Sequence, residues 1–109
     1  MKILNIGSLN LDYVYRVDHI VAPGETEATT CMNVFPGGKG FNQSVALARA
    51  GVEVYHGGMI GQDGTLFLEE CKKYGVNGKY IKILEGKTGH TIIQVEKKGQ
   101  NSILLFWGD

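Results

Sequence analysis

The chain lacks an excess of charge of either sign, because 11 basic side chains balance 11 acidic ones over 109 residues. Electrostatic binding of nucleic acid or an anionic membrane needs a basic surface, so we expect neither partner. Long apolar runs are also missing, and the longest, Ile103 to Trp107, is far too short to span a bilayer. The apolar start at residues 1–7 is too short for a signal peptide. We therefore expect a soluble, cytoplasmic protein.

Cysteine and histidine are too scattered to predict a metal site. Cys31 and Cys71 stand forty positions apart, and neither belongs to a C-x-x-C motif. The three histidines show no i, i+4 spacing of the kind a helical metal site needs (His19, His56 and His90). We interpret both cysteines as buried small hydrophobes rather than as a disulfide or zinc ligands.

Glycine, in contrast, is abundant at 16 residues and is gathered at a few places. Without a repeat this does not indicate a fibrous protein. Clustered glycines are typical of tight turns and of places where the backbone closely approaches a ligand.

The first two thirds of the chain predict alternating strands and helices. Residues 2–7 read as a short buried strand, and a second strand lies within 52–60. A helix over 41–50 has Phe41, Val45 and Ala48 on one face, and Gly51 ends it. A second helix over 65–74 would be capped by Asp63 and closed by Gly75, with Phe67, Leu68 and Cys71 facing inward. This order favours a parallel sheet covered by helices.

The remaining segments are rich in strand-forming residues. Five strands are expected, the last two joined as a β-hairpin through residues 97–101, and they lie at 11–17, 28–35, 80–84, 91–96 and 102–107. The outer segments predict a separate antiparallel sheet. The length suits one compact domain.

Two nucleotide-binding motifs fail on single positions. Gly86-Lys87-Thr88 supplies the end of a P-loop, but Ile81 stands where its first glycine is required. A dinucleotide fingerprint starting at Gly38 finds Gly40 but meets Gln43 in place of the third glycine.

The segment Gly37-Gly38-Lys39-Gly40-Phe41-Asn42-Gln43-Ser44, with Gly51 and Gly61 at set distances, resembles the first signature of the ribokinase family, the PfkB sugar kinases. Further resemblances run along the whole chain and lie at 7–12, 23–26, 61–63, 88–89 and 99–103. Leu66 departs from the family pattern, in which many members have glycine, but this position concerns a helix start.

The residues themselves are suited to sugar hydroxyls, which both donate and accept hydrogen bonds. Asp12 can accept two hydroxyl hydrogens, and Asn10, two positions earlier on an extended segment, points to the same face. By resemblance, the sugar is bound by Asn10, Asp12, Gly38, Lys39, Gly40 and Asn42, with Ile103 as an apolar wall from a lid. Taken alone, Asn10 and Asp12 would more often be a turn or a solvated edge than a sugar site, and Gly37 to Gly40 would more often be a loop before a helix.

The resemblance implies an α/β, Rossmann-like ribokinase fold, three-layered and incomplete here, with a small antiparallel β lid. The lid would be formed by residues 11–36 and 90–107, and the α/β core by 1–10 and 37–89. The implied activity is transfer of the ATP γ-phosphoryl group to a primary hydroxyl of a small sugar. Ribose is favoured, while fructose, a keto-deoxy sugar acid or a nucleoside stay open. Mg²⁺, with a monovalent cation as an option, and a homodimer through the lid are also implied.

The resemblance implies that the part that would perform the chemistry is not contained in these 109 residues. In this family the catalytic base is an aspartate in a Gly-Ala-Gly-Asp motif, which is expected beyond Asp109; Gly108-Asp109 is no substitute for it. We therefore expect the 109-residue chain to be inactive by itself. Two alternatives stay open: a non-catalytic sugar-binding or dimerisation module with the same lid, and an unrelated flavodoxin-like binding domain.

Overall fold

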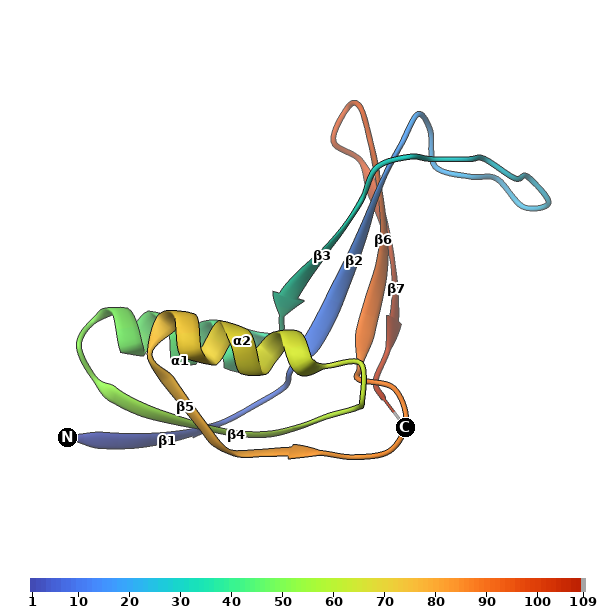
Figure 1. Ribbon diagram of the computed structural model, residues 1–109. Helices are drawn as coiled ribbons and strands as arrows, with labels where there is room; N and C mark the ends of the chain where they lie inside the picture. The colour runs from blue at the N-terminus through green and yellow to red at the C-terminus, as the bar shows by residue number, and fades with distance from the viewer. Residues whose placement is uncertain (109) are drawn as a thin grey trace.

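The computed structural model describes residues 1–108 and contains two sheets that meet at an angle (Figure 1). A three-stranded sheet has the order β1-β4-β5, and a four-stranded sheet has the order β3-β2-β6-β7. The elements are β1 (Lys2–Ile6), β2 (Asn10–Val17), β3 (Met32–Gly37), α1 (Lys39–Arg49), β4 (Glu53–Ile60), α2 (Thr65–Tyr74), β5 (Val76–Ile83), β6 (His90–Glu96) and β7 (Asn101–Phe106). Asp109, which the sequence argues against as a base, lies outside the described residues.

The three-stranded sheet is parallel throughout, as the alternation of strands and helices predicts. β1 pairs with β4, and β4 pairs with β5, with a register shift between Tyr55 and Gly57. Both helices cover the same face of this sheet (Figure 1). The result is a strand–helix–strand unit in which the strands end at one common edge, where α/β proteins bind their ligands.

The helices follow the sequence prediction closely. α2 has the predicted bounds, and Gly75 ends it in the left-handed conformation at φ 76°. α1 begins two residues earlier than expected, at Lys39. Gly38, with φ 100°, turns the chain there, so the helix starts at the next residue.

The predicted role of Asp63 as the cap of α2 is wrong. Gly64 occupies the cap position, and no side chain hydrogen-bonds the helix start there. The Asp63 carboxylate instead accepts hydrogen bonds from the backbone N–H (2.8 Å) and the hydroxyl (2.7 Å) of Thr88. Although burial raises the pKa of Asp63, these hydrogen bonds outweigh it and hold the pKa below its ordinary value. Sequence could not show this, because Thr88 lies 25 positions away.

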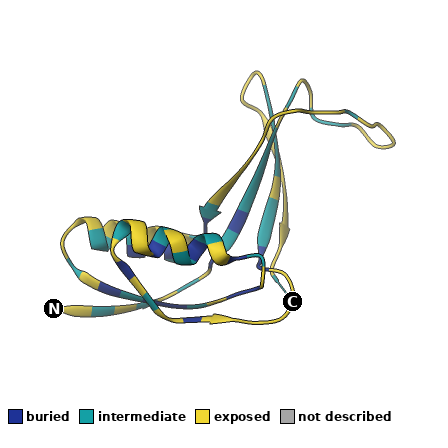
Figure 2. Ribbon diagram, in the orientation of Figure 1, coloured by how far each residue is buried: buried dark blue, intermediate teal, exposed yellow. Residues whose placement is uncertain are grey.

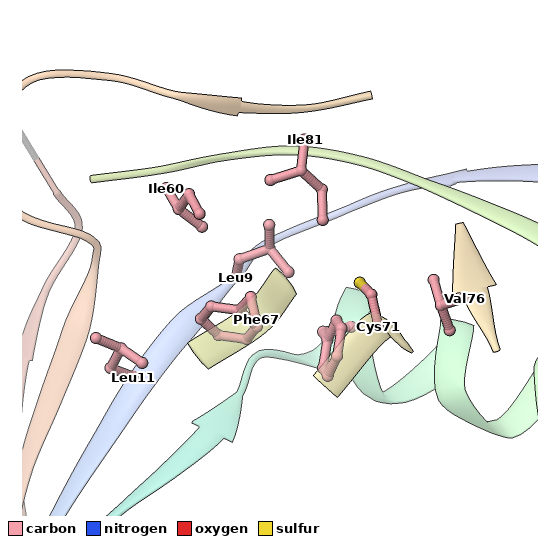
Figure 3. Packing of buried hydrophobic residues seen from close by; sticks show 8 residues of the cluster. Leu9, Leu11, Ile60, Phe67, Cys71, Val76 and Ile81 are labelled. Carbon is pink, nitrogen blue, oxygen red and sulfur yellow. The ribbon is translucent and has the colours of Figure 1, made fainter. Parts of the chain in front are cut away.

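The core lies between the helices and the sheet, and includes Leu9, Phe67 and Ile81 (Figure 3). Phe41 and Phe67 meet edge to face, with ring centroids 5.0 Å apart. The predicted inward residues of α1 are confirmed, since Phe41 is buried and Val45 and Ala48 pack against the cluster.

The interpretation of the cysteines holds for one of the two. Cys71 is a buried thiol in the core, and burial raises its pKa. Cys31 is exposed, so its predicted burial is wrong; it lies in the excursion before β3 rather than inside a strand.

The four-stranded sheet, called the lid from here, stands away from the helices (Figure 1). β2 pairs with β3, and β6 with β7, in the antiparallel sense that the sequence predicts. The central pair, β2 with β6, is parallel, so the sheet is mixed. Both strands run outward from the three-stranded sheet, which makes them parallel to each other, while β3 and β7 return.

The strand expected at 28–35 runs instead from Met32 to Gly37. Before it, the Thr29 hydroxyl donates to the Arg16 carbonyl at 2.6 Å and accepts from the Cys31 N–H at 3.3 Å. A threonine side chain that takes backbone partners in this way competes with regular strand pairing. Residues 18–31 thus form a long excursion at the outer end of the lid (Figure 1).

One face of the parallel sheet has no helix of residues 1–108 over it (Figure 2). Leu4, Ile6 and Met59 are 55%, 74% and 63% exposed on this side, although all three are strand residues of the sheet. Exposed apolar patches of this kind mark surfaces that another segment or molecule covers.

Neither α1 nor α2 is long and apolar enough to cross a membrane, and they are the helices of residues 1–108.

Thr88 ties the lid to the parallel sheet, and its loss is expected to destabilise the protein. Its hydroxyl accepts from the Gly61 N–H at 2.8 Å and donates to Asp63, and the residue is 1% exposed. Thr88→Val keeps the shape but leaves the buried Gly61 N–H without its acceptor and removes the hydroxyl hydrogen bond to Asp63, which keeps the bond from the residue 88 N–H. We expect the free energy of unfolding to fall by about 1–3 kcal/mol in chemical denaturation. Thr65→Val, at an exposed position, is the control, with a change within about 0.5 kcal/mol. Equal effects of the two variants would contradict this role.

Candidate substrate-binding site

Asn10 and Asp12 share one face of β2, because successive side chains of a strand alternate between its faces. The register places Asn10 opposite Gly37 and Asp12 opposite Phe35. Both polar residues are half-buried, and the Asp12 carboxylate accepts a hydrogen bond from the Thr91 hydroxyl at 2.7 Å. The carboxylate is thus held in place by β6 and keeps capacity to accept further hydrogen bonds.

The backbone at Gly37 and Gly38 lies directly against this polar face. A Cβ at Gly37 would overlap the Asp12 carboxylate, and a Cβ at Gly38 would overlap the Ser8 carbonyl. Gly38 also has φ 100°, which side chains rarely adopt. Glycine is required at both positions, because a Cβ would meet the Asp12 carboxylate at Gly37 and the Ser8 carbonyl at Gly38.

The first turn of α1 presents the next three predicted residues. Lys39 and Asn42 are exposed, and Gly40 packs its backbone on Gly7 so closely that a Cβ at Gly7 would stand 2.6 Å from the Gly40 Cα. The first N–H groups of any helix have no acceptor within the helix, and the positive end of the helix dipole lies with them. The helix start therefore adds hydrogen-bond donors beside the acceptor Asp12.

A cavity of about 360 Å³ adjoins the site at the carboxyl ends of the parallel strands. Asn10 is the one predicted site residue of the described chain that lines it, together with Gly61, Gly89 and Trp107 among others. Asp12, Lys39 and Asn42 lie outside this lining. The cavity and the predicted polar cluster therefore meet at Asn10 rather than coincide.

Ile103, predicted as an apolar wall, lies on the edge strand β7 and is 58% exposed. It pairs with Ile93, which shares a face with Thr91 and hence with Asp12. Leu105, which pairs with Thr91, is the β7 residue level with Asp12. The structure thus places Ile103 on the face that carries Asp12, one step farther out than Leu105.

Sequence reasoning missed Thr91 and Gly37 as members of the site. Thr91 occurs within a predicted strand, but only the parallel pairing of β2 with β6 brings it to Asp12. Gly37 was visible as half of a glycine pair, and only the register shows that its backbone covers Asp12.

A second group that sequence reasoning missed lies beneath the site. Asn5 donates from its Nδ2 to the Gly40 carbonyl at 2.8 Å and to the Ser44 Oγ at 3.0 Å. Ser44 Oγ lies 2.7 Å from the Nδ1 of His56, and the His56 Nε2 lies 3.1 Å from the Gly7 carbonyl. Ser44 and His56 are both fully buried, at 0% exposure.

The partners decide the direction of each hydrogen bond in this group. A carbonyl can only accept, so the His56 Nε2 carries the proton that is donated to Gly7. A neutral His56 then has an unprotonated Nδ1, which accepts from the Ser44 hydroxyl, and the hydroxyl oxygen accepts from Asn5. Burial lowers the pKa of His56, although its hydrogen bond to Gly7 acts in the opposite direction. The neutral ring is the form that fits.

Within residues 1–108, one group of potential metal ligands comes together, and it lies away from the candidate site, in the 18–31 excursion. Donor atoms of Asp18, His19 and Glu27 lie within 4.8 Å of one another. Asp18 is already paired with Lys97 at 2.7 Å, and the His19 Nε2 lies 2.7 Å from a Glu25 oxygen, which raises the pKa of His19. We assign no metal to this group.

The fold is that of an α/β protein, and a polar strand end, a glycine turn that covers it and the start of a helix form a candidate small-molecule site at the carboxyl edge of its sheet. The family model described as pfkB family carbohydrate kinase matches residues 1–109. The chain belongs to that family.

The relatives and solved structures that match include several ribokinases. The chain is 37% identical to a ribokinase of Staphylococcus aureus over 111 residues, which cover 98% of this chain and 36% of the relative. A crystal structure of a ribokinase from Cryptococcus neoformans in complex with ADP superposes with a TM-score of 0.91 at 42% identity, over 98% of this chain and 34% of that one. A ribokinase from Arabidopsis thaliana complexed with ribose and ATP gives a TM-score of 0.86 at 28% identity, over 96% and 35%. The chain thus spans about a third of the length of these relatives.

The buried His56 is expected to make the protein less stable in mild acid. Its pKa is lowered by folding, so below the ordinary value of 6.5 the unfolded chain binds a proton that the folded chain does not. Stability from the neutral ring is therefore complete above about pH 6.5 and declines as the pH falls toward the folded pKa. We expect the free energy of unfolding to decrease between pH 7 and 5, and His56→Gln to flatten this decrease.

His19 provides the control, because folding raises its pKa instead of lowering it. Its contribution to the free energy of unfolding is complete below about pH 6.5 and is lost as the pH rises through the folded pKa. Denaturation curves recorded at each pH measure the free energy of unfolding and so test both histidines. A His56→Gln variant with the parent's full acid sensitivity would contradict the assignment.

Proposed function

We propose that this chain is the sugar-binding N-terminal part of an ATP-dependent carbohydrate kinase that phosphorylates a primary hydroxyl of a small sugar, with ribose as the favoured acceptor. The observation that carries the proposal is the placement of Asn10 and Asp12 against the Gly37–Gly38 backbone at the start of α1. Family membership supports the reaction class. The ribokinase names of the relatives, and the solved ribokinase complex with ribose and ATP, support the substrates.

In this proposal the chain positions the acceptor. Asp12 accepts from sugar hydroxyls, Asn10 and Asn42 both donate and accept, and Lys39 donates from an exposed position. Gly38 and Gly40 allow the ring to approach the backbone. Holding the hydroxyl in a fixed orientation contributes to the rate by proximity rather than by proton transfer.

ATP, Mg²⁺ and a monovalent cation would be held outside this site. A magnesium ion needs several oxygen ligands in octahedral geometry. Among the proposed site residues Asp12 is the one carboxylate, and one of its oxygens already accepts from Thr91. These residues therefore do not fit a magnesium site. The catalytic base is likewise expected beyond Asp109, so the 109-residue chain is expected to have no phosphotransferase activity alone.

The cytoplasm is the compartment we propose. Both cysteines are free thiols, and Cys31 is exposed, which suits a reducing environment.

The expected test of the sugar site compares Asp12→Ala with Lys39→Ala in the full-length protein. Loss of the carboxylate leaves sugar hydroxyls unpaired at about 1–3 kcal/mol each, so kcat/KM for ribose should fall at least about tenfold. Lys39 is exposed, and we expect its loss to cost less than about threefold. Coupled assays of ADP release measure both.

Asp18→Ala is the matched control, because it removes an exposed carboxylate from just beyond the other end of β2. Its kinetics should be those of the parent. Equal losses in the Asp12 and Lys39 variants would reject the ranking, and no turnover of any small sugar by the parent would reject the function.

The apolar face of the lid supports a homodimer, in agreement with the dimerisation role considered as an alternative function. Phe35, Ile103 and Leu105 are 49%, 58% and 42% exposed, and the strand pairings place all three on the face that carries Asp12. A second copy would bury this face. We expect Ile103→Asp to convert the full-length protein to monomers in light scattering after size exclusion.

Leu104 is the control for this test, because it neighbours Ile103 on β7, faces the opposite side and is 69% exposed. Leu104→Asp should leave the dimer intact. A parent protein that is monomeric at micromolar concentration would refute the homodimer.

A further inference from the structure

The two halves of the proposed site are supported by one buried group of side chains. Gly7 precedes Asn10 by three residues, and Gly40 follows Gly38 by two. The Gly7 carbonyl accepts from His56, and the Gly40 carbonyl accepts from Asn5. Ser44 joins the two donors, since it contacts Asn5 at 3.0 Å and His56 at 2.7 Å. The group Asn5–Ser44–His56, called the buried triplet, therefore connects β1, α1 and β4.

The geometry at Gly7 and Gly40 explains why such a connection matters. Their backbones touch without side chains between them, and a Cβ at Gly7 would stand 2.6 Å from the Gly40 Cα. Side-chain packing thus cannot set the spacing between the end of β1 and the first turn of α1. The hydrogen bonds of the buried triplet hold the carbonyls of these same two residues. They therefore fix the distance between the end of β1 and the first turn of α1.

The triplet is also well suited to hold one arrangement. Ser44 and His56 are 0% exposed, so bulk solvent does not reach them, whereas Asn5 is half-buried. Each hydrogen bond of the triplet has one consistent direction, from Asn5 to Ser44, from Ser44 to His56 and from His56 to Gly7. In a buried network, removal of one member leaves the next without a partner, and the members therefore act together.

We infer that the buried triplet of Asn5, Ser44 and His56 is a positioning unit that sets the sugar affinity of the site, by fixing the first turn of α1 relative to the Gly7–Asn10 segment. None of the three side chains is among the residues proposed to contact the sugar, so they are positioning residues. The inference rests on the proposed function, because it names the groups that hold that site in shape.

The test separates sugar binding from nucleotide binding in the full-length protein. Ser44→Ala removes the central hydroxyl while keeping the Cβ. We expect the KM for ribose to rise about tenfold, from the loss of buried hydrogen bonds, with the KM for ATP changed less than about twofold. His56→Leu should raise the ribose KM at least as much. His56→Gln, which can still donate toward Gly7, should recover part of the loss.

Val54→Ala is the matched control. Val54 is 1% exposed and lies two residues before His56 on the same face of β4, but it belongs to the core and not to the triplet. Its truncation destabilises the protein without touching Gly7 or Gly40. We expect a lowered Tm and an unchanged ribose KM. If Val54→Ala and Ser44→Ala raise the ribose KM in the same proportion to their loss in Tm, the inference is overturned. A Ser44→Ala variant with the ribose KM of the parent would also overturn it.

Hydrogen exchange tests the positioning role of the triplet independently of whether the proposed function is correct. Amides of residues 7–10 and 38–42 should exchange faster in Ser44→Ala than in the parent, while those of β6 and β7 stay the same and Val54→Ala lacks the local effect. If the parent phosphorylates no sugar, the proposed function fails and the exchange pattern still decides the positioning role. Unchanged exchange at 7–10 and 38–42 would refute it.

Discussion

The contact between the Gly7 and Gly40 backbones is the constraint from which the site follows. It brings the turn after β1 and the first turn of α1 closer together than any pair of side chains would allow. Gly38 then turns into the helix beside Ser8, and Gly37 lies on the Asp12 carboxylate. These glycine contacts therefore bring the Asp12 carboxylate and the start of α1 close together, which is the arrangement on which the proposed sugar site rests.

The lid and the parallel sheet are joined where β2 and β6 leave the sheet's carboxyl edge. Leu11 is buried in the common core, and Thr88 is bonded to Asp63 and to the Gly61 N–H. These contacts fix the base of the lid, whereas its outer end is exposed (Figure 2). Such a sheet keeps its polar base in register with the site while its apolar face stays available for another molecule.

The uncovered apolar face of the parallel sheet agrees with the length comparison. Leu4, Ile6 and Met59 are exposed on a sheet whose other face is fully packed by two helices. The chain spans about a third of the length of its ribokinase relatives, which continue beyond the part that it matches.

Local signals accounted for the parts of the fold that short stretches of sequence control. The bounds of α2 followed from its apolar spacing and from Gly75, which adopts the left-handed end that only glycine takes readily. Asp63 and Cys31 were misjudged for a common reason. Asp63 takes a partner 25 positions away, and the burial of Cys31 depends on an excursion whose shape long-range contacts decide.

The sequence by itself determined the order of strands and helices, the glycine turn before α1 and the polar pair Asn10 and Asp12, because periodicity, turn chemistry and a family pattern all act over short distances. Only the tertiary structure decided that β2 and β6 run parallel, that Thr91 reaches Asp12, and that Asn5, Ser44 and His56 lie under the site. Those contacts join residues 12 to 79 positions apart. Nothing local in a sequence states which distant residues will share a buried hydrogen bond.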